Sequence, residues 1–103
     1  MRTVTADEIV TAFEKTGLRP VQKAIGVDLC GCALAALYEL SVTGGKRDSA
    51  YDWADDQFGT GGKWALIHGF DGESPKQLPE TRFHLNYIAG REAAKRLGLP
   101  VEE

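Results

Sequence analysis

The stretch LCGCALAALYELSV, residues 29–42, decides the fold because it is the longest mostly apolar segment of the 103-residue chain. Drawn as a helix, it carries apolar side chains on most of its circumference, which is typical of a helix buried on all sides. Leu34, Leu37 and Leu40 supply its bulk, and each fully buried leucine contributes about 1.5–3 kcal/mol. Residues 29–42 therefore predict a central helix that the rest of the chain surrounds.

Helices are also predicted towards both ends of the chain. Thr5 followed by Glu8 matches the capping-box pattern, which begins a helix over residues 6–16 that Gly17 ends. Near the other end, apolar residues recur at helical spacing over residues 80–97. This spacing predicts a long final helix.

One further helix is predicted between the central and final helices. Residues 49–58, SAYDWADDQF, have helical periodicity, and Gly59 ends the pattern. Their apolar stripe, which we expect to face the core, consists of Tyr51, Ala54 and Phe58.

Residues 60–72, TGGKWALIHGFDG, are ambiguous between two structures. They fit a short helix, which we favour, or a strand that pairs with residues 21–27. The run GTGGKW at residues 59–64 is interpreted as a turn. It lacks both the glycine spacing and the Ser or Thr of a phosphate-binding Walker A loop.

These elements predict a mainly α fold, a compact bundle of four or five helices around a central apolar helix at about residues 29–42. One short strand pair is an additional feature of this prediction, and an α+β fold is the alternative. The length is typical of one domain, so residues 1–103 are predicted to form a single small globular domain.

Charge and hydropathy disfavour several classes of partner. The chain has 12 basic and 15 acidic residues and a net charge of −3, which disfavours nucleic acid. No segment approaches the roughly 18 consecutive apolar residues of a membrane helix. The start, MRTVTADEIVTAF, carries acidic residues where a signal peptide is apolar. We therefore expect a cytoplasmic protein that does not bind membranes.

A nucleic-acid-binding helical domain is nevertheless kept as an alternative. Residues 8–27 place Gly17 between two candidate helices, as in a helix-turn-helix motif. Pro20 interrupts the second of these helices, and Lys23 stands where the motif normally buries an apolar side chain. Both features weigh against this alternative.

The two cysteines and two histidines are candidates for a metal site or for a reactive pair. Cys30 and Cys32 are separated by one residue, whereas paired zinc-binding cysteines are usually separated by about two to four. We predict no metal, no cofactor and no catalytic residue, with at least one thiol buried as a small apolar group. A small cysteine-dependent enzyme, with His68 or His84 as the base, is the second alternative.

Aromatic and charged residues supply the candidates for a binding surface, because aromatic rings are enriched at the centres of protein interfaces. Trp53 lies off the apolar stripe of its helix, and the motif GFDG places two residues between glycines. The final helix is basic, whereas residues 48–56 contain four aspartates that we interpret as a solvated face. The interface candidates are Trp53, Trp64, Phe70, Asp71, Arg91 and Lys95.

From these residues we predict a small non-enzymatic module for protein interaction or regulation. Its expected partner is another protein or a second copy of the chain, since aromatic and complementary charged surfaces suit both. The sequence does not indicate a particular small-molecule ligand.

Overall fold

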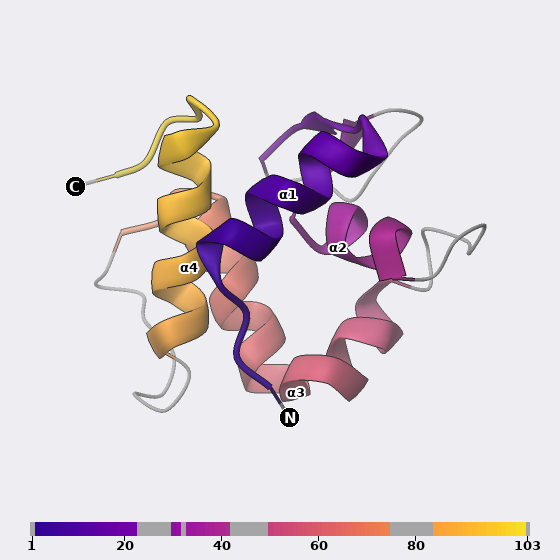
Figure 1. Cartoon of the computed structure of the whole chain (residues 1–103). Coiled ribbons are helices and arrows are strands. Elements are labelled where there is room, and N and C mark those ends of the chain that lie inside the picture. Colours follow the sequence, from indigo (N-terminus) through magenta and orange to yellow (C-terminus); the bar gives the residue numbers. More distant parts are fainter. Residues whose placement is uncertain (1, 23–29, 32, 42–49, 75–83, 103) are drawn as a thin grey trace.

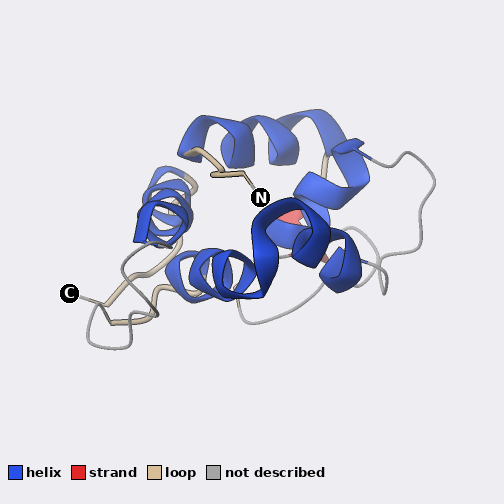
Figure 2. Ribbon diagram, turned by 90° about the horizontal axis from the view of Figure 1, so that it is seen from below, coloured by secondary structure: helices blue, strands red, loops and turns tan. Residues whose placement is uncertain are grey.

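The computed structural model describes residues 2–22, 30–31, 33–41, 50–74 and 84–102. These ranges hold four helices and two very short strands (Figure 1). In chain order the elements are α1 (Ala6–Thr16), β1 (Arg19–Pro20), β2 (Cys30–Gly31), α2 (Ala33–Ser41), α3 (Ala50–Phe70) and α4 (His84–Arg96). Figure 2 shows how completely helices dominate this part of the chain, and the prediction of a mainly α bundle is confirmed.

Helix α1 forms as its local sequence predicts. The Thr5 hydroxyl accepts a hydrogen bond from the Glu8 backbone N–H at 3.2 Å, and the Glu8 carboxylate accepts one from the Thr5 backbone N–H at 3.3 Å. This capping box satisfies two of the backbone donors that a helix start leaves unpaired. Gly17 ends the helix, and the buried face consists of Ile9, Ala12 and Phe13.

Helix α2 lies inside the bundle, and residues 33–38 are buried without exception. It is shorter than the predicted helix over residues 29–42, because the backbone of Cys30 and Gly31 pairs in parallel with Arg19 and Pro20 instead. Glycine has a low helix propensity, so Gly31 adds little preference for extending α2 in place of this strand pairing. Leu40 was expected in the core, but its side chain is exposed.

Helix α3 is bent at Gly59, whose φ of 75° and ψ of 159° lie outside the helical region. Only glycine adopts this conformation without strain. The bend separates a first arm, residues 50–58, from a second arm, residues 60–70. In Figure 1 the first arm crosses the lower edge of the molecule and the second rises beside α4.

The predictions for residues 59–72 are therefore confirmed in part. The favoured helix is present, and the alternative strand is excluded because residues 60–70 are helical. The turn predicted for GTGGKW is wrong beyond its first residue, since the helix resumes directly after Gly59. The strand pair does exist, but it joins residues 19–20 to residues 30–31.

The second arm of α3 and helix α4 run in the same direction and approach closely. The Asn86 side-chain amide donates to the Gly62 carbonyl at 3.3 Å. Further along, a Cβ atom added at Gly90 would lie 2.6 Å from the Leu66 carbonyl oxygen. Because glycine has no side chain, the two backbones can pack at this distance.

The core joins all four helices and the N-terminal segment. Phe13 of α1 stacks on Phe70 of α3 with ring centroids 5.6 Å apart. The Val4 backbone N–H donates to the buried Asn86 side chain at 2.9 Å, which fixes the N-terminal segment against α4. Helix α4 was predicted over residues 80–97, and its described part begins at His84, with residues 80–83 outside the described ranges.

Candidate functional site

The bend in α3 places two aromatic rings from different arms side by side. Tyr51 on the first arm and Trp64 on the second have ring centroids 6.0 Å apart and planes inclined by 36°. Tyr51 is 38% exposed and Trp64 is 41% exposed. Rings of this size usually contribute to a core, so a paired and partly exposed arrangement marks a surface of interest.

Lys63 is buried close to both rings. Its ammonium nitrogen lies 5.2 Å from the Tyr51 centroid and 4.9 Å from the Trp64 centroid. The same nitrogen lies 2.9 Å from Oδ1 of Asp55, in an ion pair without a directional hydrogen bond. A buried ammonium group requires such compensation, because its desolvation is costly. Lys63 therefore links the second arm to both Tyr51 and Asp55 of the first arm.

The outer side of the first arm is acidic. Asp52 and Asp56 are exposed and stand one helical turn apart. Neither carboxylate has an ion-pair or hydrogen-bond partner within the described part of the chain. We call the surface formed by Tyr51, Asp52, Asp56 and Trp64 the elbow face. It combines exposed rings with negative charge that no described residue compensates.

The second arm is anchored at its C-terminal end, beyond the bend. His68 lies 6.2 Å from Trp64 between ring centroids, and its Nδ1 contacts the Glu73 carboxylate. The backbone carbonyl of Glu73 accepts a hydrogen bond from the Tyr87 hydroxyl at 2.7 Å. These contacts fix the end of α3 to α4, so Trp64 is carried on a supported helix.

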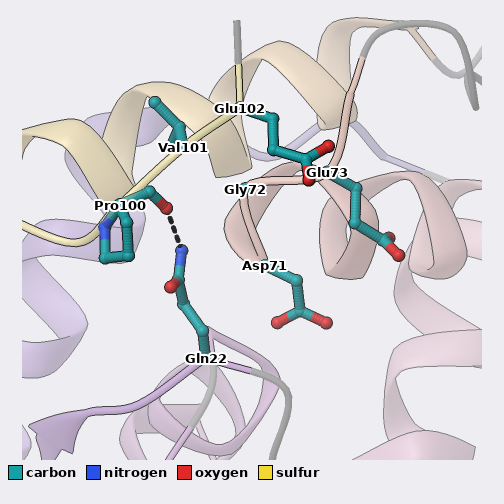
Figure 3. A pocket seen from close by; sticks show the side chains of 7 residues that line it. All are labelled: Gln22, Asp71, Gly72, Glu73, Pro100, Val101 and Glu102. Atoms are coloured by element: carbon teal, nitrogen blue, oxygen red, sulfur yellow. Dashed lines mark hydrogen bonds between the residues drawn. The ribbon is translucent and has the colours of Figure 1, made fainter.

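A cavity of about 260 Å³ lies between the end of α3 and the C-terminal segment (Figure 3). It is lined by Gln22, Asp71, Gly72, Glu73, Pro100, Val101 and Glu102. The Gln22 amide donates to the Pro100 carbonyl at 2.6 Å and to the Phe70 carbonyl at 3.0 Å. The Ser74 backbone N–H donates to the Glu102 carboxylate at 3.1 Å. These polar groups are engaged in holding chain segments together.

The motif GFDG forms one wall of this cavity and serves the fold. Gly72 has a φ of 76°, its N–H donates to the Gly69 carbonyl at 3.0 Å, and the Glu73 N–H donates to the His68 carbonyl at 3.1 Å. This is the Schellman pattern that ends a helix. A Cβ atom at Gly72 would also lie 2.4 Å from the Pro100 carbonyl oxygen. The turn therefore ends α3 and packs against the C-terminal segment.

A second cavity, of about 300 Å³, lies between α1 and α2. Its lining residues are Arg2, Asp7, Glu8, Thr11, Leu37, Leu40 and Ser41. The charged groups among them are already paired, since Arg2 contacts Glu8 at 2.8 Å and Asp7 contacts Arg96. Its apolar wall is formed by Leu37 and the exposed Leu40.

The aromatic residues predicted as interface candidates differ in how exposed they are. Trp64 is exposed, whereas Phe70 is 1% exposed and stacks in the core, so Phe70 cannot serve as a surface contact. Trp53 is half-buried and packs edge-on against Tyr38 and Phe58 at 5.7 and 5.9 Å. Its position off the apolar stripe reflects this second contact within the fold.

The charged residues predicted as interface candidates also differ in their surroundings. Arg91 donates to the carbonyls of Glu73 and Glu102, so it fixes the C-terminal segment. Asp71 is half-buried on the wall of the cavity in Figure 3, and its backbone N–H continues the helical hydrogen-bonding pattern at the end of α3. Lys95 is exposed on α4. Its neighbour Arg96 is held by a hydrogen bond to Asp7, which raises the pKa of the Arg96 guanidinium.

Sequence reasoning missed two features of the surface. Tyr51 was placed on a buried stripe, but the bend of α3 turns its ring towards Trp64 and leaves it partly exposed. On α4, Leu85 and Ile88 are both exposed. Their spacing of three residues puts them on one side of the helix, and this pattern is visible in the sequence.

The predictions about thiols and metals lie largely outside the described residues. Cys30 belongs to β2, but its side chain and the whole of Cys32 are not described. Within the described ranges, no cluster of three or more His, Cys, Asp or Glu residues is arranged to hold a metal ion. None of the described helices combines the length and apolar content of a bilayer crossing.

Comparisons with protein-family models, with curated proteins and with solved structures gave no significant match.

Proposed function

We propose that this chain is a non-enzymatic protein-interaction module that acts in the cytoplasm and binds its partner through the elbow face. The observation that carries the proposal is the exposed ring pair of Tyr51 and Trp64, set over the buried Lys63. Tryptophan and tyrosine are enriched among the residues that dominate binding energy in protein interfaces.

The support of the rings favours binding, because ordering side chains opposes association. An immobilised side chain costs about 0.5–1.5 kcal/mol on binding. Trp64 already contacts Tyr51, Lys63 and His68, and Lys63 is tied to Asp55. Much of the ordering cost is thereby met during folding, so a partner meets a prearranged surface.

Site-specific photo-crosslinking tests this proposal. A photoreactive p-benzoyl-phenylalanine replaces Trp64, and the same residue is introduced at Glu14 on α1 and at Leu85 on α4 as matched exposed controls. We expect a discrete product from position 64 and none from position 14. The protein captured at position 64, once purified, should bind the wild-type chain, and Trp64→Ala should weaken this binding by about thirtyfold.

Two results would overturn the proposal. One is the absence of any product specific to position 64. The other is capture at position 85 alone, which would assign the binding surface to the exposed side of α4 that carries Leu85 and Ile88. Circular dichroism of Trp64→Ala separates a lost contact from a lost fold, because the Trp64 ring is not part of the buried core.

A further inference from the structure

We infer that the elbow face recognises a basic segment of a partner protein, rich in arginine or lysine, and not a second copy of this chain. This inference rests on the proposed function and adds the chemistry of the partner. It follows from the charge that remains on the elbow face once the internal ion pair has been counted.

The negative charge of the elbow face is uncompensated within the described part of the chain. Asp55 is paired with Lys63, but Asp52 and Asp56 have no such partner there. Lys63 is itself buried, so its charge is directed to Asp55 and to the two rings. A partner that approaches from solvent therefore meets two carboxylates and no exposed ammonium group among these residues.

The exposed rings favour the same partner. Tyrosine and tryptophan faces attract cations, and arginine binds them best because its planar guanidinium group also stacks. Trp64 and Tyr51 keep a large part of their surface open to solvent. One arginine of a basic segment can thus stack on a ring while another pairs with Asp52 or Asp56.

The carboxylates of Asp52 and Asp56 disfavour two other partners, a second copy of the chain and a nucleic acid. In a two-fold dimer the same surface meets itself. The carboxylates of Asp52 and Asp56 would then face those of the second copy, and like charges in contact oppose association. A nucleic acid is disfavoured for the same reason, because its phosphates would meet these carboxylates.

A titration with hexa-arginine at about 0.1 M ionic strength, where the Debye length is about 10 Å, tests the inference. The variant Trp53→Phe leaves Trp64 as the chain's remaining tryptophan, so its emission reports on the elbow face. We expect a saturable change in this emission. In the same background, Asp52→Asn/Asp56→Asn should weaken binding by about tenfold, as expected for the loss of two exposed ion pairs. Binding should also weaken with added salt.

A charge-matched variant provides the control. Glu14→Gln/Glu92→Gln removes the same number of negative charges from α1 and α4, away from the elbow face. It should change the affinity by less than about twofold, because screened charges at a distance contribute little. Isothermal titration calorimetry of the wild-type chain gives an affinity that does not depend on the Trp53 substitution.

The outcomes separate the inference from the proposed function. Equal weakening by the two double variants overturns the inference, because binding then follows net charge alone. If hexa-arginine does not bind but a partner is captured at position 64, the inference of a basic partner is wrong. The proposed function as a protein-interaction module is then still supported. A crosslink from position 64 to a second copy of the chain overturns the inference in favour of self-association.

Discussion

The ammonium group of Lys63 lies 2.9 Å from the carboxylate of Asp55, and this ion pair joins the two arms of α3. Its members differ in environment, since the Lys63 side chain is 8% exposed and the Asp55 side chain is 36% exposed. The cation thus depends on the pair for its compensation, whereas the carboxylate also reaches water. The two residues should therefore respond differently to substitution.

Asp55→Asn should destabilise the fold by about 2–3 kcal/mol, because it leaves a buried ammonium group without its counter-charge. Lys63→Met should cost less than about 1 kcal/mol, since an apolar side chain of similar length fills the same space and Asp55 remains partly solvated. Urea unfolding of both variants measures these costs. Equal costs, or the reverse order, would show that the ion pair does not act as described.

Gly59→Ala should destabilise the chain by about 1–3 kcal/mol, because a Cβ atom is strained at a φ of 75° and a ψ of 159°. It should also lower the efficiency of crosslinking from position 64 by disturbing the contact between Tyr51 and Trp64. Thr60→Ala, the exposed neighbour, serves as the control and should be neutral or slightly stabilising. Thermal unfolding followed by circular dichroism compares the two, and an unchanged melting temperature for Gly59→Ala would contradict the prediction.

Gly90→Ala should cost about 3 kcal/mol, because the added methyl group would lie 2.6 Å from the Leu66 carbonyl oxygen and 2.7 Å from the Phe70 nitrogen. Both atoms are backbone, so the helices themselves must move apart. Lys95→Ala on the exposed side of α4 should change stability by less than about 0.5 kcal/mol. Chemical denaturation distinguishes them, and similar midpoints for the two variants would rule out the close approach of α3 and α4.

Asn86→Ala should cost about 2–3 kcal/mol, because it removes the acceptor of the Val4 N–H and the donor to the Gly62 carbonyl in a buried place. Hydrogen exchange adds a local measurement, since the Val4 amide should lose protection while amides of α2 keep theirs. Leu85→Ala, at the exposed preceding position, should leave the Val4 amide unchanged. Full protection of Val4 in Asn86→Ala would refute the assigned contact.

Parts of the fold governed by local chemistry were predictable from the sequence. The capping box of Thr5 and Glu8 and the stop at Gly17 depend on residues a few positions apart, and α1 formed as expected. The start of α2 was not predictable in this way. It depends on the pairing of residues 30–31 with residues 19–20, a tertiary contact that overrides local propensity.

The elbow face was only partly predictable for a related reason. Trp64 was identified as an interface candidate from its residue type, and it is exposed. The position of Tyr51 beside it depends on the bend at Gly59, where a glycine in the sequence fits a helix end as well as a kink. Phe70 was misassigned because its flanking glycines suggested a surface turn, whereas one glycine ends α3 and the other packs against α4.

The hydrogen bond between Val4 and Asn86 connects residues that are 82 positions apart. On the ribosome, the N-terminal segment therefore has no acceptor for this bond until α4 has emerged. Helix α1 can form early from its own caps, but the bundle closes only after α4 has been synthesised. Until then Ile9 and Phe13, which α4 and the second arm of α3 later help to cover, stay open to chaperones.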